Sequence, residues 1–164
     1  MSKRVGVENN DVLSPDFLDF IACLNERDVD FVLIGGYALG VHGVIRATAD
    51  IDFLYRRTKM AVRRLCSAME DFGAPSEVID EDALMTPEIV MQFGQPPHRI
   101  DLLNAIDGVS FEQVWGGATR TTVQGQPLRV IGLAELRANK AATGRKKDAE
   151  DLRRLAARTA RKKR

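Results

Sequence analysis

The chain has 164 residues and a formal net charge of +1, a size at which one globular domain can bury a substantial core. No apolar run approaches the length of a membrane span, and the polar start, MSKRVGVENND, lacks the apolar segment of a signal peptide. Cys23 and Cys66 do not have the spacing of a metal site, so we expect reduced thiols in a cytoplasmic protein with no membrane partner.

The first half of the chain is expected to alternate helices and strands. Ser14 and Pro15 are typical of an N-cap and a first helical position, and apolar residues recur at helical spacing from Phe17 to Leu24. The elements predicted after this helix are a strand at 31–34, a short helix at 37–42, a strand at 50–55 and a helix that Thr58 caps and Gly73 ends. Residues 74–88 show no clear pattern.

Two hairpins and then two helices are expected in the second half. The hairpins join strands 89–93 and 99–103, then 119–123 and 127–131, and the helices span about 133–143 and 146–157 with a break at Gly144. Together these elements predict an α/β (α+β) fold, with a mixed sheet of about five strands, helices mainly on one face and a C-terminal helix pair.

Residues 31–55, FVLIGGYALGVHGVIRATADIDFLY, carry the strongest chemical signal. Gly35 and Gly36 follow a strand and precede a short helix, so their backbone N–H groups are open to an anion. Asp50 and Asp52 alternate with apolar residues and therefore point to one face of their strand. Two carboxylates this close favour a hard divalent ion such as Mg²⁺, although a half-exposed strand also alternates in this way.

A third carboxylate, Asp101, stands between Ile100 and Leu102 with the same alternation. If its strand is the neighbour of the first acidic strand, Asp101 joins Asp50 and Asp52 in one small volume. We therefore expect an acidic cluster beside the glycine turn.

This order of residues resembles the DNA polymerase beta superfamily of nucleotidyltransferases. Its signature is a strand, a Gly-Gly or Gly-Ser turn, a helix, a strand with two alternating acids and a later lone carboxylate. The likeness is to the small bacterial branch that includes antibiotic nucleotidyltransferases and toxins of toxin–antitoxin systems, and NKAATGRKKDAEDLRRL is similar to the closing helix pair of that branch. Tyr37 departs from the branches that carry a Ser after one Gly, which leaves phosphate binding there to the backbone.

The resemblance also implies a domain organisation and a reaction. Residues 1–14 are expected to form a flexible N-terminus, 15–157 a nucleotidyltransferase-like domain and 158–164 a basic tail. The implied reaction moves a nucleoside monophosphate from an NTP to a hydroxyl or other acceptor and releases pyrophosphate. Two Mg²⁺ ions are expected, bound by the catalytic residues Asp50, Asp52 and Asp101, with Asp101 also as proton acceptor, and Gly35 and Gly36 would hold the triphosphate.

Three further residues are candidate nucleotide ligands. Arg46 and Thr48 lead directly into the first acidic strand, where they either contact phosphates or support Asp50. Lys140 continues the apolar stripe of a predicted helix, so its ammonium must reach water along its stem or meet an anion. The triphosphate is the anion that the resemblance supplies.

Two other functions stay open at this point. A non-catalytic nucleotide-binding or partner-binding module, as in a toxin–antitoxin complex, would keep the fold and act through a cognate protein partner. Residues 153–164 hold seven Arg or Lys and no acid, which suits nucleic-acid binding but equally suits a solvated helix end. The sequence does not identify the acceptor, the preferred base or the oligomeric state.

Overall fold

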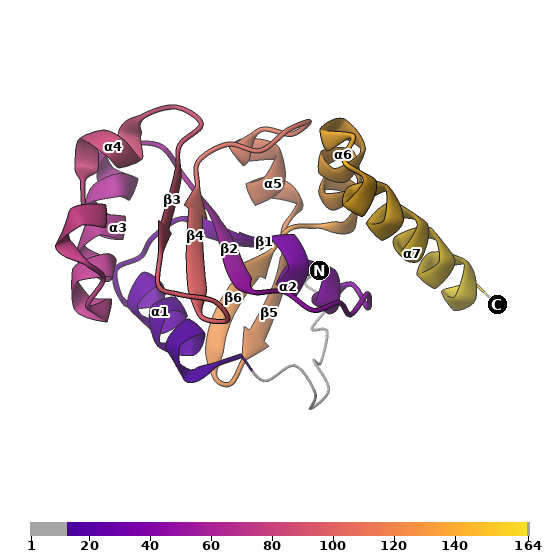
Figure 1. Ribbon diagram of the computed structural model, residues 1–164, viewed down its shortest axis with the longest axis horizontal. Helices are drawn as coiled ribbons and strands as arrows, with labels where there is room; N and C mark the ends of the chain where they lie inside the picture. The colour runs from indigo at the N-terminus through magenta and orange to yellow at the C-terminus, as the bar shows by residue number, and fades with distance from the viewer. Residues whose placement is uncertain (1–12, 164) are drawn as a thin grey trace.

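A six-stranded mixed sheet forms the centre of the protein, seen in a computed structural model that describes residues 13–163 (Figure 1). Its strands follow the order β3-β4-β2-β1-β6-β5. Their bounds are β1 Phe31–Ile34, β2 Asp50–Tyr55, β3 Val90–Phe93, β4 Arg99–Leu103, β5 Thr119–Val123 and β6 Gln126–Val130. The mixed sheet confirms the fold class that the sequence predicts, with one strand more than the expected five. Residues 1–12 of the predicted flexible N-terminus lie outside the described residues.

The pairing directions bring distant parts of the chain together. β1 runs antiparallel to β2 and parallel to β6, while β2 runs parallel to β4. The outer pairs β3–β4 and β5–β6 are antiparallel hairpins, as their short connections predict. In the β2–β4 register, Asp52 lies opposite Asp101 and Asp50 lies opposite Arg99.

One face of the sheet packs against helices α1 (Pro15–Glu26) and α3 (Lys59–Phe72), which also contact each other. The rings of Phe20 in α1 and Phe53 in β2 lie 5.7 Å apart within this core. Thr58 caps α3 at its start and Gly73, in the left-handed conformation, ends it, as expected. Because side chains alternate along β2, the acids next to Phe53 must face away from this layer.

The C-terminal helix pair stands on the other side of the sheet, where α6 (Leu133–Thr143) and α7 (Lys146–Lys162) pack against each other (Figure 1). Gly144 separates them with φ of 66°, a left-handed value that suits glycine. α7 continues five residues beyond the predicted end at Ala157, because Arg, Lys and Ala favour a helix and no Gly or Pro interrupts them.

Four short elements complete the chain: α2 (Gly35–Val41), the 3₁₀ turn η1 (Ser76–Val78), α4 (Glu81–Met85) and α5 (Phe111–Gly117). The sequence pattern predicts α2 but not α5, which a capping box between Ser110 and Gln113 begins. Among the described residues, no helix is both long and apolar enough to cross a membrane.

Candidate active site

Three aspartates from β2 and β4 converge on the sheet face opposite α1 and α3. Asp50, Asp52 and Asp101 each place a carboxylate oxygen within 4.8 Å of the others. The parallel pairing of β2 with β4 produces this arrangement, because it sets Asp52 directly beside Asp101. The predicted convergence is confirmed. We refer to these three residues, together with Arg99, as the acid cluster.

Charge repulsion shapes the protonation of the acid cluster. Burial, followed by the charges of Asp50 and Asp101, raises the pKa of Asp52 to about 7. Burial also raises the pKa of Asp101, although Arg99 opposes the change. Burial acts in the same direction on Asp50, but hydrogen bonds with Asp101, Thr48 and Arg99 outweigh it and lower the pKa of Asp50. Three adjacent carboxylates thus share too little positive charge to be fully ionised without a further cation.

The donor set suits a divalent metal ion. Carboxylate oxygens are the ligands that Mg²⁺ prefers, and three of them meet here on a rigid pair of neighbouring strands. Binding of a cation would also relieve the repulsion that raises the pKa of Asp52. The acid cluster therefore fits a divalent metal site.

The glycine turn between β1 and α2 lies directly against the acid cluster. Gly35 has φ of 75°, and a Cβ built on it would overlap the carboxylate of Asp52. A Cβ on Gly36 would lie 3.0 Å from Cβ of Thr48. Close packing and the left-handed backbone thus favour glycine at position 35, whereas a methyl group at position 36 would crowd Thr48; the turn leaves backbone rather than side chain next to Asp52.

A cavity of about 620 Å³ opens over the acid cluster and the glycine turn. One wall is the sheet face with its aspartates, and the other is the C-terminal helix pair with Leu136, Lys140 and Asp148. All eight site residues predicted from the sequence line it: Gly35, Gly36, Arg46, Thr48, Asp50, Asp52, Asp101 and Lys140. Arg145 and Lys147 add further positive charge to the wall.

Thr48 supports the acid cluster. Its hydroxyl donates a hydrogen bond to Oδ1 of Asp50 at 3.0 Å. The sequence left open whether Thr48 contacts phosphate or supports Asp50, and this bond corresponds to the second of those roles.

Lys140 and its partners form a second charged group. The Lys140 ammonium is buried and lies 2.9 Å from both Asp148 Oδ1 and Asp151 Oδ2. Arg46 reaches Asp151 at 3.0 Å, and Arg145 reaches Asp148 at 2.7 Å. We refer to these five residues as the helix-pair cluster. Lys140 does meet an anion, and in this structure the anions are two carboxylates of α7.

Arg46 connects this cluster to the loop that precedes β2. Its side chain is only 19% exposed, and its partner Asp151 is 2% exposed. The contact therefore ties the loop that carries Thr48 to helix α7. It holds one wall of the cavity against the other.

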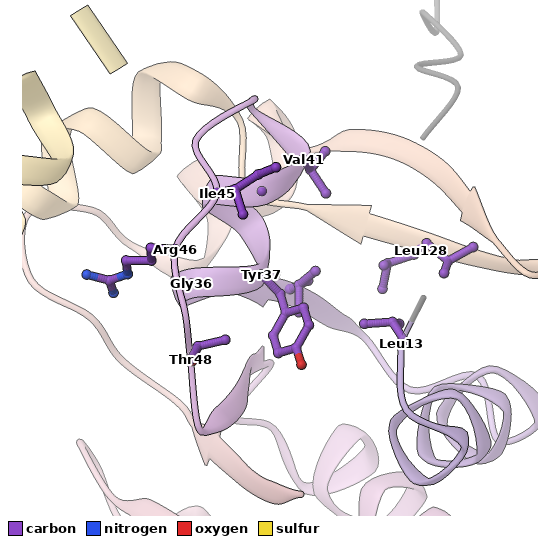
Figure 2. Close-up of a pocket in the computed structure, with 11 residues that line it drawn as sticks. Leu13, Gly36, Tyr37, Val41, Ile45, Arg46, Thr48 and Leu128 are labelled. Atoms are coloured by element: carbon purple, nitrogen blue, oxygen red, sulfur yellow. The ribbon is translucent and has the colours of Figure 1, made fainter. Parts of the chain in front are cut away.

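A smaller, mainly apolar cavity of about 170 Å³ has residues of this loop in its lining (Figure 2). Its apolar wall includes Leu13, Tyr37, Val41, Ile45 and Leu128, and the guanidinium of Arg46 points away from them. Gly36, Arg46 and Thr48 line both cavities, so they form a common wall between them.

Sequence reasoning missed two parts of this arrangement. Arg99 lies two residues before Asp101, so the period of the strand already places both on one face. Its contact with Asp50 depends on the long-range register, which no local pattern gives. Asp151 is likewise three residues after Asp148 on α7, but its pairing with Lys140 depends on how the two helices pack.

Comparison with known protein families identifies the family of this chain. Residues 14–164 match the family described as "Nucleotidyl transferase of unknown function (DUF2204)". The chain belongs to this family. Because the match includes both acidic strands and the helix pair, this nucleotidyl transferase family member carries a candidate catalytic triad in Asp50, Asp52 and Asp101.

Two solved structures resemble the chain. The antibiotic-resistance factor ANT(2'')-Ia in solution is similar with a TM-score of 0.58 and 16% sequence identity, over 87% of this chain and 81% of that one. ANT(2'')-Ia in complex with adenylyl-2''-tobramycin gives a TM-score of 0.48 at 16% identity, over 88% and 95% of the two chains. No curated protein sequence matches the chain. The first likeness agrees with the nucleotidyltransferase-type fold expected from the sequence.

Proposed function

We propose that this protein is a Mg²⁺-dependent nucleotidyltransferase that moves a nucleoside monophosphate from an NTP to an acceptor hydroxyl or other nucleophile. The observation that carries the proposal is the meeting of three carboxylates within 4.8 Å beside a glycine turn. Membership of a nucleotidyl transferase family supports it. The cavity of about 620 Å³ above these residues offers room for a ligand.

The proposed reaction forms one bond and breaks one. The acceptor oxygen bonds to the α-phosphorus, the bond from that phosphorus to the bridging oxygen of the β-phosphate breaks, and pyrophosphate leaves. The acceptor proton passes to Asp101, which we assign as the general base. Asp50 and Asp52 would hold two Mg²⁺ ions and Asp101 would hold one of them. When bound, Mg²⁺ neutralises phosphate charge and lowers the pKa of the attacking hydroxyl.

The remaining walls of the cavity would bind the triphosphate. The N–H groups of Gly35 and Gly36 are assigned to phosphate oxygens, since a side chain at either glycine would fill the space. The Lys140 ammonium has three N–H donors: one bonds Asp148 Oδ1, and the ammonium also forms an ion pair with Asp151, so we assign a third donor to a phosphate. We assign Arg46 and Thr48 to holding the loop before β2 in place, and we further propose that they contact a phosphate of the bound nucleotide.

The partner-binding and nucleic-acid-binding alternatives predict different binding behaviour from that of the enzyme. Exposed cations follow one another along the second half of α7 and at its C-cap, namely Arg153, Arg154, Arg158, Arg161, Lys162 and Lys163. If these cations bind an RNA or DNA acceptor, binding falls steeply with salt and is lost when they are neutralised. A non-catalytic module would bind nucleotide or a cognate protein without any transfer.

The test uses NTPs labelled at the α-phosphate, Mg²⁺ and a panel of acceptors that includes aminoglycosides, RNA and proteins. We expect label transfer and pyrophosphate release by the wild type. Asp52→Asn should lower the rate by at least about 10²–10³-fold, the size of losing one charge-stabilising group. Asp82→Asn changes an exposed carboxylate on α4 and serves as the matched control that keeps full activity.

The proposal fails if the wild type neither binds nucleotide nor gains thermal stability from Mg²⁺ with NTP at millimolar concentrations. A native-state ligand at a hundred times its Kd stabilises a protein by about 2.7 kcal/mol, so binding is readily seen. Binding without transfer to any acceptor, and without pyrophosphate release, would favour the non-catalytic module.

A further inference from the structure

Arg99 occupies the acid cluster in a way that the proposed reaction does not explain. It lies at the start of β4, directly opposite Asp50 and two residues before Asp101 on the same strand face. Its Nη2 lies 2.6 Å from Asp50 Oδ2, and its Nε lies 2.9 Å from Asp101 Oδ1. The guanidinium therefore bridges two of the three carboxylates that a metal ion would use.

These hydrogen bonds leave no oxygen of Asp50 or Asp101 without a partner. Thr48 donates to Oδ1 of Asp50, and Arg99 donates to its Oδ2. Arg99 donates to both oxygens of Asp101, and Gln92 adds a bond of 3.3 Å to Oδ2. Arg99 thus makes three of the five bonds, and each is a charge-assisted bond of the stronger kind.

A divalent ion and this guanidinium compete for the same oxygens. Both are cations, and two positive charges a few ångströms apart repel each other strongly in a partly buried site. The Arg99 side chain is 32% exposed and also lines the cavity of about 620 Å³, so it has space in which to move away from the carboxylates. Anions placed in that cavity would give the displaced guanidinium new partners.

We propose that Arg99 is a resident counter-cation that holds Asp50 and Asp101 in the metal-free protein and gives them up when a divalent ion binds together with a triphosphate. A metal ion alone must displace Arg99 without replacing its partners, so it binds weakly. A metal ion with a triphosphate brings the phosphate oxygens that Arg99 then contacts, so it binds well. Arg99 is thus a positioning residue that couples metal binding to nucleotide binding, an inference that rests on the proposed function.

The first measurement is the Kd of Mn²⁺ alone, from electron paramagnetic resonance of free Mn²⁺, for the wild type and Arg99→Gln. We expect Arg99→Gln to bind Mn²⁺ about tenfold more tightly, the change that corresponds to one charged hydrogen bond. Arg99→Lys keeps the charge but loses the two-pronged contact, so its affinity should lie between the two. Arg63→Gln, on α3 and outside the cavity lining, is the matched control with wild-type affinity.

The second measurement is the Kd of Mn²⁺ complexes with α,β-methylene ATP and GTP, from calorimetry. Arg99→Gln should bind these complexes no more tightly than the wild type, so the preference for metal with nucleotide over metal alone shrinks about tenfold. Melting in EDTA and in Mn²⁺ gives an independent readout. The variant should melt below wild type in EDTA, because three carboxylates lose their cation, and recover in Mn²⁺.

Three results separate the inference from the proposed function. If the wild type binds neither Mn²⁺ nor its nucleotide complexes, the proposed function itself falls. If the wild type binds them and Arg99→Gln binds Mn²⁺ alone equally or less tightly, Arg99 does not compete with metal and the inference is wrong. If Arg99→Gln does not fold, Arg99→Lys decides by the same comparison, and equal Mn²⁺ affinity for it and wild type overturns the inference.

Discussion

The acid cluster and four of the five residues of the helix-pair cluster line the same cavity, but the two clusters differ in the balance of their charges. The acid cluster sets three carboxylates against one guanidinium, and burial with repulsion raises the pKa of Asp52 to about 7. The helix-pair cluster sets two carboxylates against three cations. Burial alone would raise the pKa of Asp148, but hydrogen bonds from Thr143, Lys140 and Arg145 lower it to about 2.

This difference separates a cluster suited to binding a cation from a cluster suited to supporting the fold. An added cation stabilises carboxylates that have too little positive charge around them. Carboxylates that already have cation partners resist proton and metal binding alike, and removal of one partner leaves a buried charge uncompensated. Both clusters contain aspartates at or beside one cavity, and the charged neighbours of those aspartates distinguish them.

Lys140→Met should have the largest effect, because it removes the ammonium shared by two buried carboxylates. We expect a loss of about 3–5 kcal/mol in the free energy of unfolding, measured with urea, although Met keeps most of the apolar stem. Lys146→Met, at the exposed start of α7, is the matched control.

The same variant also tests the proposed phosphate contact of Lys140. Measured well below its melting temperature, Lys140→Met should bind NTP more weakly by about 1.5–3 kcal/mol if the third donor reaches a phosphate. A stability loss with unchanged affinity would place Lys140 in the structural group alone. Unchanged stability would contradict the distinction between the two clusters.

Gly35→Ala should have the second-largest effect. We expect a loss of about 1–3 kcal/mol in the free energy of unfolding, because alanine is strained in the left-handed conformation of this residue and would also disturb Asp52. Because the new methyl group meets the Asp52 carboxylate, we expect metal binding to weaken together with stability. Gly40→Ala is the control within the same helix, where a Cβ meets no atom within 4 Å and alanine favours the helix. If the two variants show the same stability and the same metal affinity, the glycine turn is not fitted to the acid cluster.

The smallest effect concerns pH, and its sign follows from the lowered pKa of Asp148. A carboxyl group whose pKa falls from about 3.9 in the unfolded chain to about 2 in the folded protein stabilises the fold fully above about pH 4. That stabilisation is lost as the pH falls from about 4 toward 2. The difference in unfolding free energy between wild type and Asp148→Asn should therefore be constant near neutral pH and shrink in acid. A difference that persists at pH 2 would show that packing, not charge, is lost in the variant.

Local signals in the sequence were enough to predict most elements and the residues of the acidic triad. The glycine turn at Gly35 and the alternation around Asp52 and Asp101 are visible in a few consecutive residues. The helix α5 was missed because its short sequence, FEQVWGG, ends in two glycines that weaken a helical pattern. The roles of Arg99 and Asp151 were not predictable locally, since each depends on packing between elements distant in the chain.

The parallel pairing of β2 with β4 determines when, during folding, the three aspartates come together. Residues 56–98, which include α3, α4 and β3, must form a closed loop before the two acidic strands can lie side by side. Closing a loop costs chain entropy that only the later strand contacts offset, which slows such pairings relative to local hairpins and helices. Early folding intermediates and ribosome-bound fragments that end before β4 therefore lack the three-carboxylate pocket. The three-carboxylate cluster is thus a property of the completed sheet alone.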